Sequence, residues 1–220
     1  MPKLVSKSLT WERIRTTDIG LDLGFLNNEL TVGFDWYQRE NRDMLAPAQV
    51  LPNSVGATAP YDNAGTLRTR GWELNLDWHH KFGEFNVYAN FNLSDSKTKV
   101  TKWNNDTKLL SSYYSGKNYG DIWGFETDRY FEESDFTGQN ADGSWNYKPG
   151  IASQSALERA PFHYGPGDIK FKDLDGSGEI DGGKGTADDH GDLKVIGNSL
   201  PRYEYGFHLG GSCLLYTSPS

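Results

Sequence analysis

The sequence has little cysteine, little positive charge and no long apolar run. One cysteine, Cys213, among 220 residues excludes a disulfide framework and any zinc site built from several cysteines. The formal net charge of −8 argues against a protein that grips nucleic acid, because phosphate binding requires a surplus of lysine and arginine. No stretch reaches the roughly 18 consecutive apolar residues of a transmembrane helix, which excludes helical membrane proteins. After Met1, no charged region leads into an apolar one, so these residues show no secretory signal.

What the sequence does have is 25 glycines, 14% aromatic residues and a clear period-two alternation. Alternation of apolar and polar residues marks strands with one apolar and one polar face. We therefore predict an all-β fold with about five antiparallel strands, each about as long as a tilted bilayer crossing requires, roughly 9–11 residues. The apolar positions are Ile19, Leu21 and Leu23; Leu30, Val32, Phe34 and Trp36; Leu74, Leu76 and Trp78; Phe85, Val87, Ala89, Phe91 and Leu93; and Tyr203, Tyr205, Phe207 and Leu209.

The connections between these strands alternate in length. Residues 25–29 and 81–84 are tight turns, whereas 44–65 and about 102–201 are long irregular excursions. Short turns at one end and long loops at the other are typical of an outer-membrane β-barrel with a polar lumen and an apolar, lipid-facing exterior. A soluble β-sandwich also alternates, but a structureless loop of about a hundred residues is unusual in a compact domain. Aromatic residues near the strand ends suit interfacial girdles: Trp11, Trp36, Tyr37, Trp72 and Trp78.

Several segments, in order along the chain, carry a family resemblance. The chain resembles the C-terminal barrel region of SusC/RagA-family TonB-dependent outer-membrane transporters. The matching segments are Leu9-Thr10-Trp11-Glu12, Thr17-Asp18-Ile19-Gly20-Leu21-Asp22, Phe34-Asp35-Trp36-Tyr37, Asp43-Met44-Leu45, Asn63-Ala64-Gly65 with Arg70-Gly71-Trp72-Glu73-Leu74, Phe91-Asn92-Leu93-Ser94-Asp95-Ser96, Gly120-Asp121-Ile122-Trp123-Gly124, Pro166-Gly167-Asp168-Ile169-Lys170 and Gly197-Asn198-Ser199-Leu200-Pro201-Arg202-Tyr203.

The resemblance implies part of a large transmembrane β-barrel in the outer membrane of a Gram-negative cell. Such a barrel has about 22 strands and a plugged lumen, of which this chain would supply about five. The family's plug, TonB-contacting segment and signal peptide would lie upstream. The implied function is import of oligosaccharides or peptides with a SusD-like lipoprotein, energised through TonB, ExbB and ExbD. It requires no cofactor and involves no enzymatic step. The alternative is a secreted or surface β-sandwich that binds carbohydrate and is stabilised by calcium. A third possibility, a calcium-dependent glycan hydrolase, is disfavoured because no acid/base pair is identifiable in the sequence.

An acidic segment offers the one candidate metal site. Oxygen donors occur at alternate positions, and Gly178 stands where an EF-hand-type calcium loop requires glycine. Position 12 is Lys184 rather than the bidentate glutamate, so Asp188, Asp189 or Asp192 would have to complete the coordination. The alternative is a turn-rich loop in which Asp and Gly are the favoured turn residues. The candidate ligands are Asp173, Asp175, Ser177, Glu179 and Asp181.

No catalytic constellation is recognisable. His79 and His80 are adjacent on an expected strand, so their side chains should point to opposite faces and share no metal. The long loop is rich in aromatic residues, which can stack on sugars, pack the loop or contact a partner lid. These are Tyr113, Tyr114, Tyr119, Trp123, Phe125, Tyr130, Phe131, Trp145 and Tyr147.

The last eight residues interrupt the expected strand. Residues 213–220 resemble a translated transposon-end sequencing adapter, which predicts that residues 1–212 are the barrel segment and that Cys213 carries no functional information.

Overall fold

The computed structural model describes residues 9–47 and 61–213, and the predicted all-β fold is confirmed. The chain forms two compact units. The first contains described residues up to 104, together with 115–119 and 200–213, and the second contains 105–114 and 120–199. Within the described ranges, no helix combines the length and hydropathy that crossing a bilayer requires.

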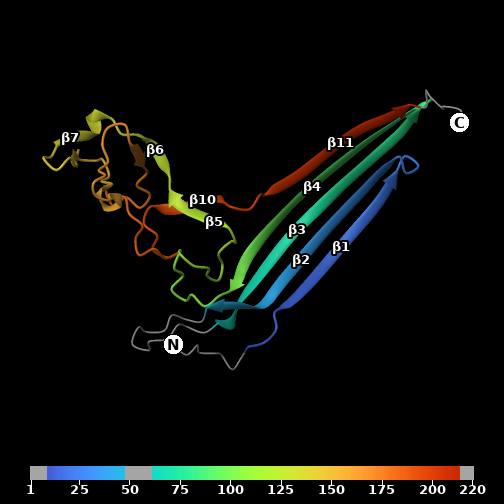
Figure 1. Ribbon diagram of the computed structural model, residues 1–220, viewed down its shortest axis with the longest axis horizontal. Coiled ribbons are helices and arrows are strands. Elements are labelled where there is room, and N and C mark those ends of the chain that lie inside the picture. Colours follow the sequence, from blue (N-terminus) through green and yellow to red (C-terminus); the bar gives the residue numbers. More distant parts are fainter. Residues whose placement is uncertain (1–8, 48–60, 214–220) are drawn as a thin grey trace. The chain divides into compact units, whose positions relative to one another are not determined.

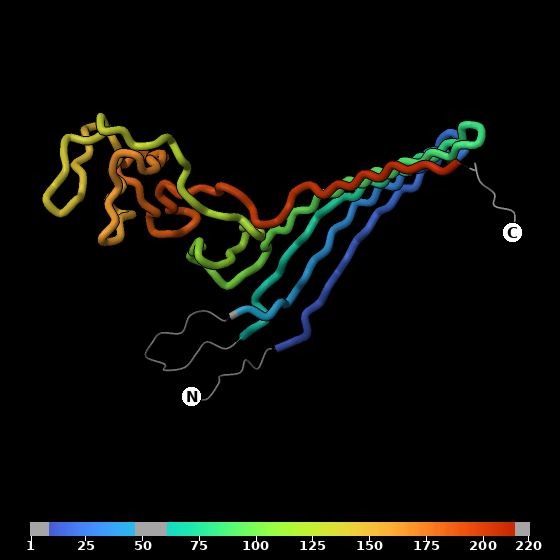
Figure 2. The backbone as a smooth tube through the Cα atoms, turned by 45° about the horizontal axis from the view of Figure 1, so that its top comes forward, coloured from blue at the N-terminus to red at the C-terminus, as the bar shows by residue number. Residues whose placement is uncertain are grey.

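The first unit is a five-stranded antiparallel sheet. Its strands lie side by side in the order β1-β2-β3-β4-β11 in both ribbon and tube views (Figures 1 and 2). The first four follow the chain order, and the fifth returns beside β4 after the second unit has been traversed. The strands are β1 (Arg13–Phe25), β2 (Leu30–Pro47), β3 (Tyr61–Phe82), β4 (Phe85–Lys102) and β11 (Tyr203–Cys213).

Four of the strands are longer than the predicted 9–11 residues: β1 to β4 contain 13, 18, 22 and 18 residues, whereas β11 contains 11. The added length lies mainly at the end of the sheet that carries the long connections, where Arg39 pairs with Thr69 and Arg68 with Lys99. Polar side chains occupy both faces there, so the apolar alternation fades while the backbone ladder continues. The sequence pattern therefore identified the centre of each strand and missed its extension.

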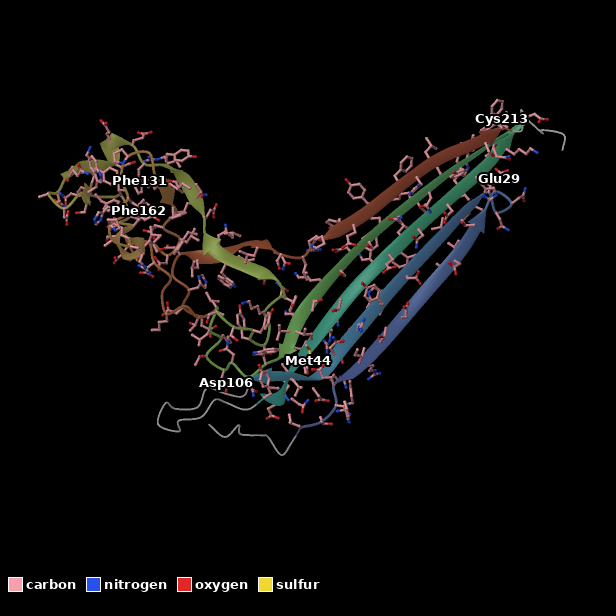
Figure 3. The ribbon with its side chains drawn as sticks, viewed as in Figure 1. Glu29, Met44, Asp106, Phe131, Phe162 and Cys213 are labelled. Carbon is pink, nitrogen blue, oxygen red and sulfur yellow. The ribbon has the colours of Figure 1, made fainter. Side chains whose placement is uncertain are left out.

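Tight turns join β1 to β2 and β3 to β4, as predicted. The first places Leu26, Asn27 and Asn28 at φ of 54°, 56° and 66°, and the second has Gly83 at φ 61°. Figure 3 shows Glu29 and Cys213 at the turn end of the sheet, with Met44 at the other end. The predicted excursion over 44–65 is wrong at both boundaries, since β2 continues to residue 47 and β3 begins at residue 61; residues 48–60 lie outside the described ranges.

Residues 102–201, predicted to be an irregular excursion, are mostly irregular but also contain six short strands. Most of this segment forms the second unit, in which β5 pairs with β10, β6 with β9 and β7 with β8. These strands contain only three to six residues, which is too short for a recognisable alternation, and two of the three pairs join segments that are distant in the sequence. The elements are β5 (Asp121–Phe125), β6 (Thr127–Tyr130), the 3₁₀ turn Glu133–Asp135, β7 (Phe136–Gln139), β8 (Trp145–Tyr147), the 3₁₀ turn Ser155–Leu157, β9 (Ile169–Phe171) and β10 (Leu193–Asn198).

Candidate functional site

The apolar face of the sheet consists of continuous cross-strand rows. Its side chains are exposed on the edge strands, where Ile19 retains 64% of its accessible surface, Phe207 64% and Leu209 67%, and partly exposed on β3. Within the described residues of the first unit, no second sheet covers this face. The rows are Leu21, Phe34, Leu74, Leu93 and Tyr205; Leu23, Val32, Leu76, Phe91 and Phe207; Phe25, Leu30, Trp78, Ala89 and Leu209; and, at the long-loop edge, Ile19, Trp36, Trp72 and Tyr203. Asp95 interrupts this last row and pairs with Arg202 at 2.8 Å.

The height of this apolar band can be worked out along β3. Trp72 marks one edge and Phe82 the other, ten residues later, and His80 is the one polar side chain on this face of β3 between them. At about 3.4 Å per residue this is about 34 Å along the strand, or about 24 Å along the membrane normal at a tilt of about 45°. Outer-membrane barrels have an apolar band about 25 Å tall. The band therefore has the dimensions of a lipid-facing belt.

Of the predicted girdle residues, Tyr37 does not belong to the apolar face. It follows Trp36 on β2, so its side chain points to the polar face, where its ring covers Gly71 on the paired strand. A Cβ at Gly71 would lie 2.5 Å from Tyr37 Cζ. Trp36, Trp72 and Trp78 lie on the apolar face as expected.

The polar face carries a hollow of about 570 Å³ near the turn end of β1, β2 and β3. Its lining includes the carboxylates of Asp22, Asp35 and Asp77 together with Asn75. On the same face, the Asn90 amide donates a hydrogen bond of 2.6 Å to Asp77. These groups suit contact with water or a polar solute, as expected of a lumen.

The acidic loop, residues 173–192, is organised around two of the predicted carboxylates and one downstream candidate. Asp173 accepts the N–H groups of Gly176 at 2.7 Å and Gly178 at 2.9 Å. Asp192 is fully buried and accepts the Leu174 N–H at 2.6 Å. Oxygens of Asp173, Asp175 and Asp192 lie within 4.8 Å of one another. The fold therefore brings together three oxygen donors, a partial set for a calcium ion that takes six to eight.

Two of the other predicted ligands, Ser177 and Asp181, form hydrogen bonds within the loop. The Ser177 hydroxyl donates to the Glu179 carbonyl at 2.8 Å, and the Asp181 carboxylate accepts the Gly183 N–H at 2.5 Å. A hydrogen bond from the Ser177 N–H lowers the pKa of Asp175. These contacts stabilise the loop's turns by themselves, so the calcium ion stays a prediction.

Two downstream candidates form ion pairs instead of facing the cluster. Asp188 pairs with Lys108 at 3.0 Å, and Asp189 pairs with Lys184 at 2.8 Å.

Several loop aromatics form the core of the second unit. Ring centroids are 5.1 Å apart for Phe131 and Phe136, 5.3 Å for Phe136 and Trp145, and 5.2 Å for Phe136 and Tyr147. Phe131 and Phe136 are 2% and 4% exposed, and burial raises the pKa of Tyr147 to about 12. Three of these four residues were predicted from the sequence. Phe136 was missed because it stands alone between polar residues.

The remaining predicted aromatics have separate environments. Trp123 contacts His190, Phe125 contacts Phe171 and Tyr114 is buried, whereas Tyr130 is 67% exposed.

An open groove of about 540 Å³ on the second unit, hereafter the loop groove, presents aromatic and polar groups together. Trp145, Phe162 and His163 line it, along with the carboxyl groups of Asp142 and Asp168. Figure 3 labels Phe131 and Phe162 within this unit. The sequence analysis did not identify Phe162, since no local pattern marks it. The groove offers aromatic faces that can stack on a ring and polar groups that can form hydrogen bonds.

Two polar contacts hold the second unit together and were also missed. Asp135, 3% exposed, receives two hydrogen bonds from Arg129 at 2.6 and 2.7 Å. Gln154 is fully buried, and its amide donates to the Ile169 carbonyl while its oxygen accepts the Phe171 N–H. Both contacts are tertiary, and neither has a sequence signature.

The prediction that His79 and His80 point to opposite faces of a strand is confirmed. The His80 ring lies between Trp78 and Phe82 on one face of β3, with centroid distances of 6.2 and 4.3 Å, so His79 points to the other face. His80 Nδ1 lies 2.7 Å from Glu29.

Strand β11 extends to the first residue of the predicted tail. Cys213 is its last residue and pairs with Phe85. Residues 214–220 lie outside the described part of the chain, and their adapter origin stays a prediction.

Comparison with known proteins identifies the family. Residues 4–182 match the model of the TonB dependent receptor-like β-barrel. TonB-dependent receptor P3 of Formosa agariphila is 27% identical over 215 residues, which cover 91% of this chain and 19% of that protein. TonB-dependent receptor SusC of Bacteroides thetaiotaomicron is 33% identical over 76 residues, covering 34% of this chain and 8% of that protein.

A solved structure of the RagAB peptide transporter has the same fold, with a TM-score of 0.59 at 22% identity, covering 93% of this chain and 20% of that chain. The chain thus spans about a fifth of the length of the first curated relative. The resemblance expected from the sequence is confirmed. This chain belongs to the TonB-dependent receptor β-barrel family.

Proposed function

We propose that this chain forms part of an outer-membrane receptor that imports a nutrient in a TonB-dependent manner. The observation that carries the proposal is the exposed apolar face, continuous over five strands and about 24 Å tall. Exposure of this apolar surface to water would be unfavourable, whereas lipid would cover it. In the described residues, β1 and β11 are edge strands, and further strands of a closed barrel would pair with them.

The proposed orientation follows from the connections. Outer-membrane barrels have short periplasmic turns and long extracellular loops. The turns after β1 and β3 would therefore face the periplasm, and the second unit would be extracellular. The polar face with Asp22, Asp35 and Asp77 would line the lumen. The activity is binding and gated passage, with no covalent change in the solute.

The proposed partners come from the relatives. One similar structure is of a peptide transporter, and another relative is SusC, which supports a peptide or oligosaccharide cargo and a SusD-like lipoprotein partner. TonB with ExbB and ExbD would supply the energy. The loop groove, with Trp145 and Phe162 beside Asp142 and Asp168, could contact either the cargo or the lipoprotein.

Energised uptake is the direct test. The full-length receptor carrying this segment would be expressed in an outer membrane, and cells would be grown on defined peptides or oligosaccharides as the sole carbon source, with and without TonB. We expect growth on at least one substrate that disappears without TonB. Growth that is independent of TonB, or a receptor that does not fractionate with the outer membrane, would overturn the proposal. Co-purification of a lipoprotein with the tagged receptor tests the partner separately.

A further inference from the structure

The face that carries the apolar band changes to charged residues beyond Trp36 and Trp72. Residues two apart on a strand share a face, so the rows continue on the same side of the sheet toward its long-loop end. Each row consists of residues that pair with one another on neighbouring strands. The first row contains Thr17, Gln38, Arg70 and Lys97; the second contains Arg15, Glu40, Arg68 and Lys99; and the third begins with Arg13 and Arg42.

Carboxylates on this part of the sheet already have partners. Glu40 is 6% exposed and is held by Arg42 and by Arg68, whose Nε lies 2.7 Å from it. Asp43 pairs with Arg13 at 2.6 Å. These ion pairs neutralise Glu40 and Asp43, but other arginine and lysine side chains on this part of the sheet form no ion pair with a carboxylate of the described ranges.

Four cations in the two rows nearest the apolar band have no carboxylate in an ion pair within the described residues. They are Arg15, Arg70, Lys97 and Lys99. Arg70 donates only to the neutral Gln38 oxygen at 2.8 Å. A chain with a net charge of −8 therefore concentrates excess positive charge on one small surface. We name Arg15, Arg68, Arg70, Lys97 and Lys99 the cationic rim.

Four residues of the rim surround a hollow of about 390 Å³. Arg68, Arg70, Lys97 and Lys99 line it, and Thr101 and Asn118 complete it with neutral hydrogen-bonding groups. No carboxylate belongs to the lining. Cations placed this closely repel one another, so an anion in the hollow would stabilise them. Guanidinium groups bind phosphate oxygens in a bidentate manner, and lysine ammonium groups add point charges.

The rim lies at a defined height relative to the lipid belt. Arg70 and Arg68 are two and four residues beyond Trp72 on β3. At about 3.4 Å per residue and a tilt of about 45°, their backbone positions are about 5 and 10 Å above the edge of the apolar band. A bilayer of about 30 Å of hydrocarbon measures about 40–45 Å with its headgroups. The rim therefore faces the headgroup layer, on the side of the long loops.

We propose that the cationic rim binds the phosphate groups of a phosphorylated glycolipid in the outer leaflet. The inference rests on the membrane placement in the proposed function and adds a specific lipid-binding surface to it. Continuity with the apolar band favours a lipid headgroup over free phosphate, because acyl chains would lie along the rows from Trp72 toward Phe82 while the phosphates reach Arg68, Arg70, Lys97 and Lys99.

The test compares lipid binding by the full-length receptor and two double variants in detergent, measured by native mass spectrometry. The probes are diphosphoryl lipid A and the same lipid with both phosphates removed. Arg70→Gln with Lys97→Gln removes two neighbouring rim cations that are exposed and unpaired with carboxylates. The matched control, Arg39→Gln with Lys81→Gln, removes two cations from the opposite face of the sheet. Heat-modifiable mobility on gels confirms that each barrel is folded.

We expect the wild-type receptor and the control to bind diphosphoryl lipid A at least about tenfold more tightly than the dephosphorylated lipid, and the rim variant to lose about tenfold. Equal binding of the two lipids, or equal binding by the rim variant and the control, would overturn the inference. Complete displacement of the lipid by inorganic phosphate, at matched ionic strength, would assign the site to free phosphate and also overturn it. Failure of TonB-dependent uptake with lipid binding intact would count against the proposed function instead.

Discussion

Replacing Asp135 by asparagine should open the second unit locally. The carboxylate is 3% exposed and accepts the Glu132 N–H at 2.9 Å as well as two hydrogen bonds from Arg129. Asparagine has nearly the same shape, but its NH₂ group would face an N–H donor in place of an oxygen. The change therefore removes an acceptor from these donors and places an NH₂ group against them, without creating a cavity.

The pKa of Asp135 provides the magnitude. Hydrogen bonds from Arg129 lower it from 3.8 to about 2, which corresponds to about 2.5 kcal/mol of stabilisation. The Arg129 side chain is 39% exposed, so solvent screening reduces the expected loss to about 2 kcal/mol. Because the folded-state pKa is depressed, this stability is fully present above the unfolded pKa near 4 and is lost as the pH falls toward 2. The effect should be constant between about pH 5 and 8.

Hydrogen exchange on the full-length receptor measures this loss. The Lys148 amide donates to the Asp135 carbonyl and the Phe131 amide to Asp168, so both report on the site. We expect their protection to fall about 30-fold in the variant. Glu133→Gln, on the same 3₁₀ turn but exposed, is the matched control and should change protection little. A fall of less than about threefold, or an equal fall in the control, would refute the reasoning.

Three further predictions concern other parts of the chain. Gly71→Val should displace the Tyr37 ring and reduce the heat-modifiable, folded fraction of the receptor on gels, whereas Gly197→Val, with no atom within 4 Å of its added Cβ, should not. The five-stranded sheet expressed alone should aggregate without detergent, because two edges and one apolar face are exposed; a detergent-free monomer that melts cooperatively would contradict this. If the acidic loop binds calcium, chelation should accelerate its proteolysis in the wild-type receptor but not in Asp192→Asn; cleavage unaffected by chelation would exclude the ion.

The central part of each long strand was predictable from local pattern. Leu74, Leu76 and Trp78 alternate with polar residues, and this period depends only on the geometry of one extended strand. The extensions were not predictable, because pairs such as Arg39 with Thr69 are polar on both sides of the backbone. The second unit escaped detection for a related reason: its short strands become strands only when distant partners pair with them.

The acidic loop shows the same division at the level of a site. The spacing of Asp173 and Asp175 was visible in the sequence, and both belong to the observed cluster. The third member could have been Asp188, Asp189 or Asp192. Only the fold selects Asp192, by burying it and directing it at the backbone of Leu174, 18 residues away in the chain. Asp188 and Asp189 instead form ion pairs with Lys108 and Lys184.

By itself, the sequence determined that this chain is built from amphipathic strands and which residues share the apolar side, because side-chain alternation is a local property of the backbone. The tertiary structure decided which residues of different strands stand in one row. Register depends on the tight turns and on the irregularity between Asn41 and Met44, which are settled when strands pair. Only that register brings Arg68 and Arg70 beside Lys99 and Lys97, and so turns scattered cations into one surface.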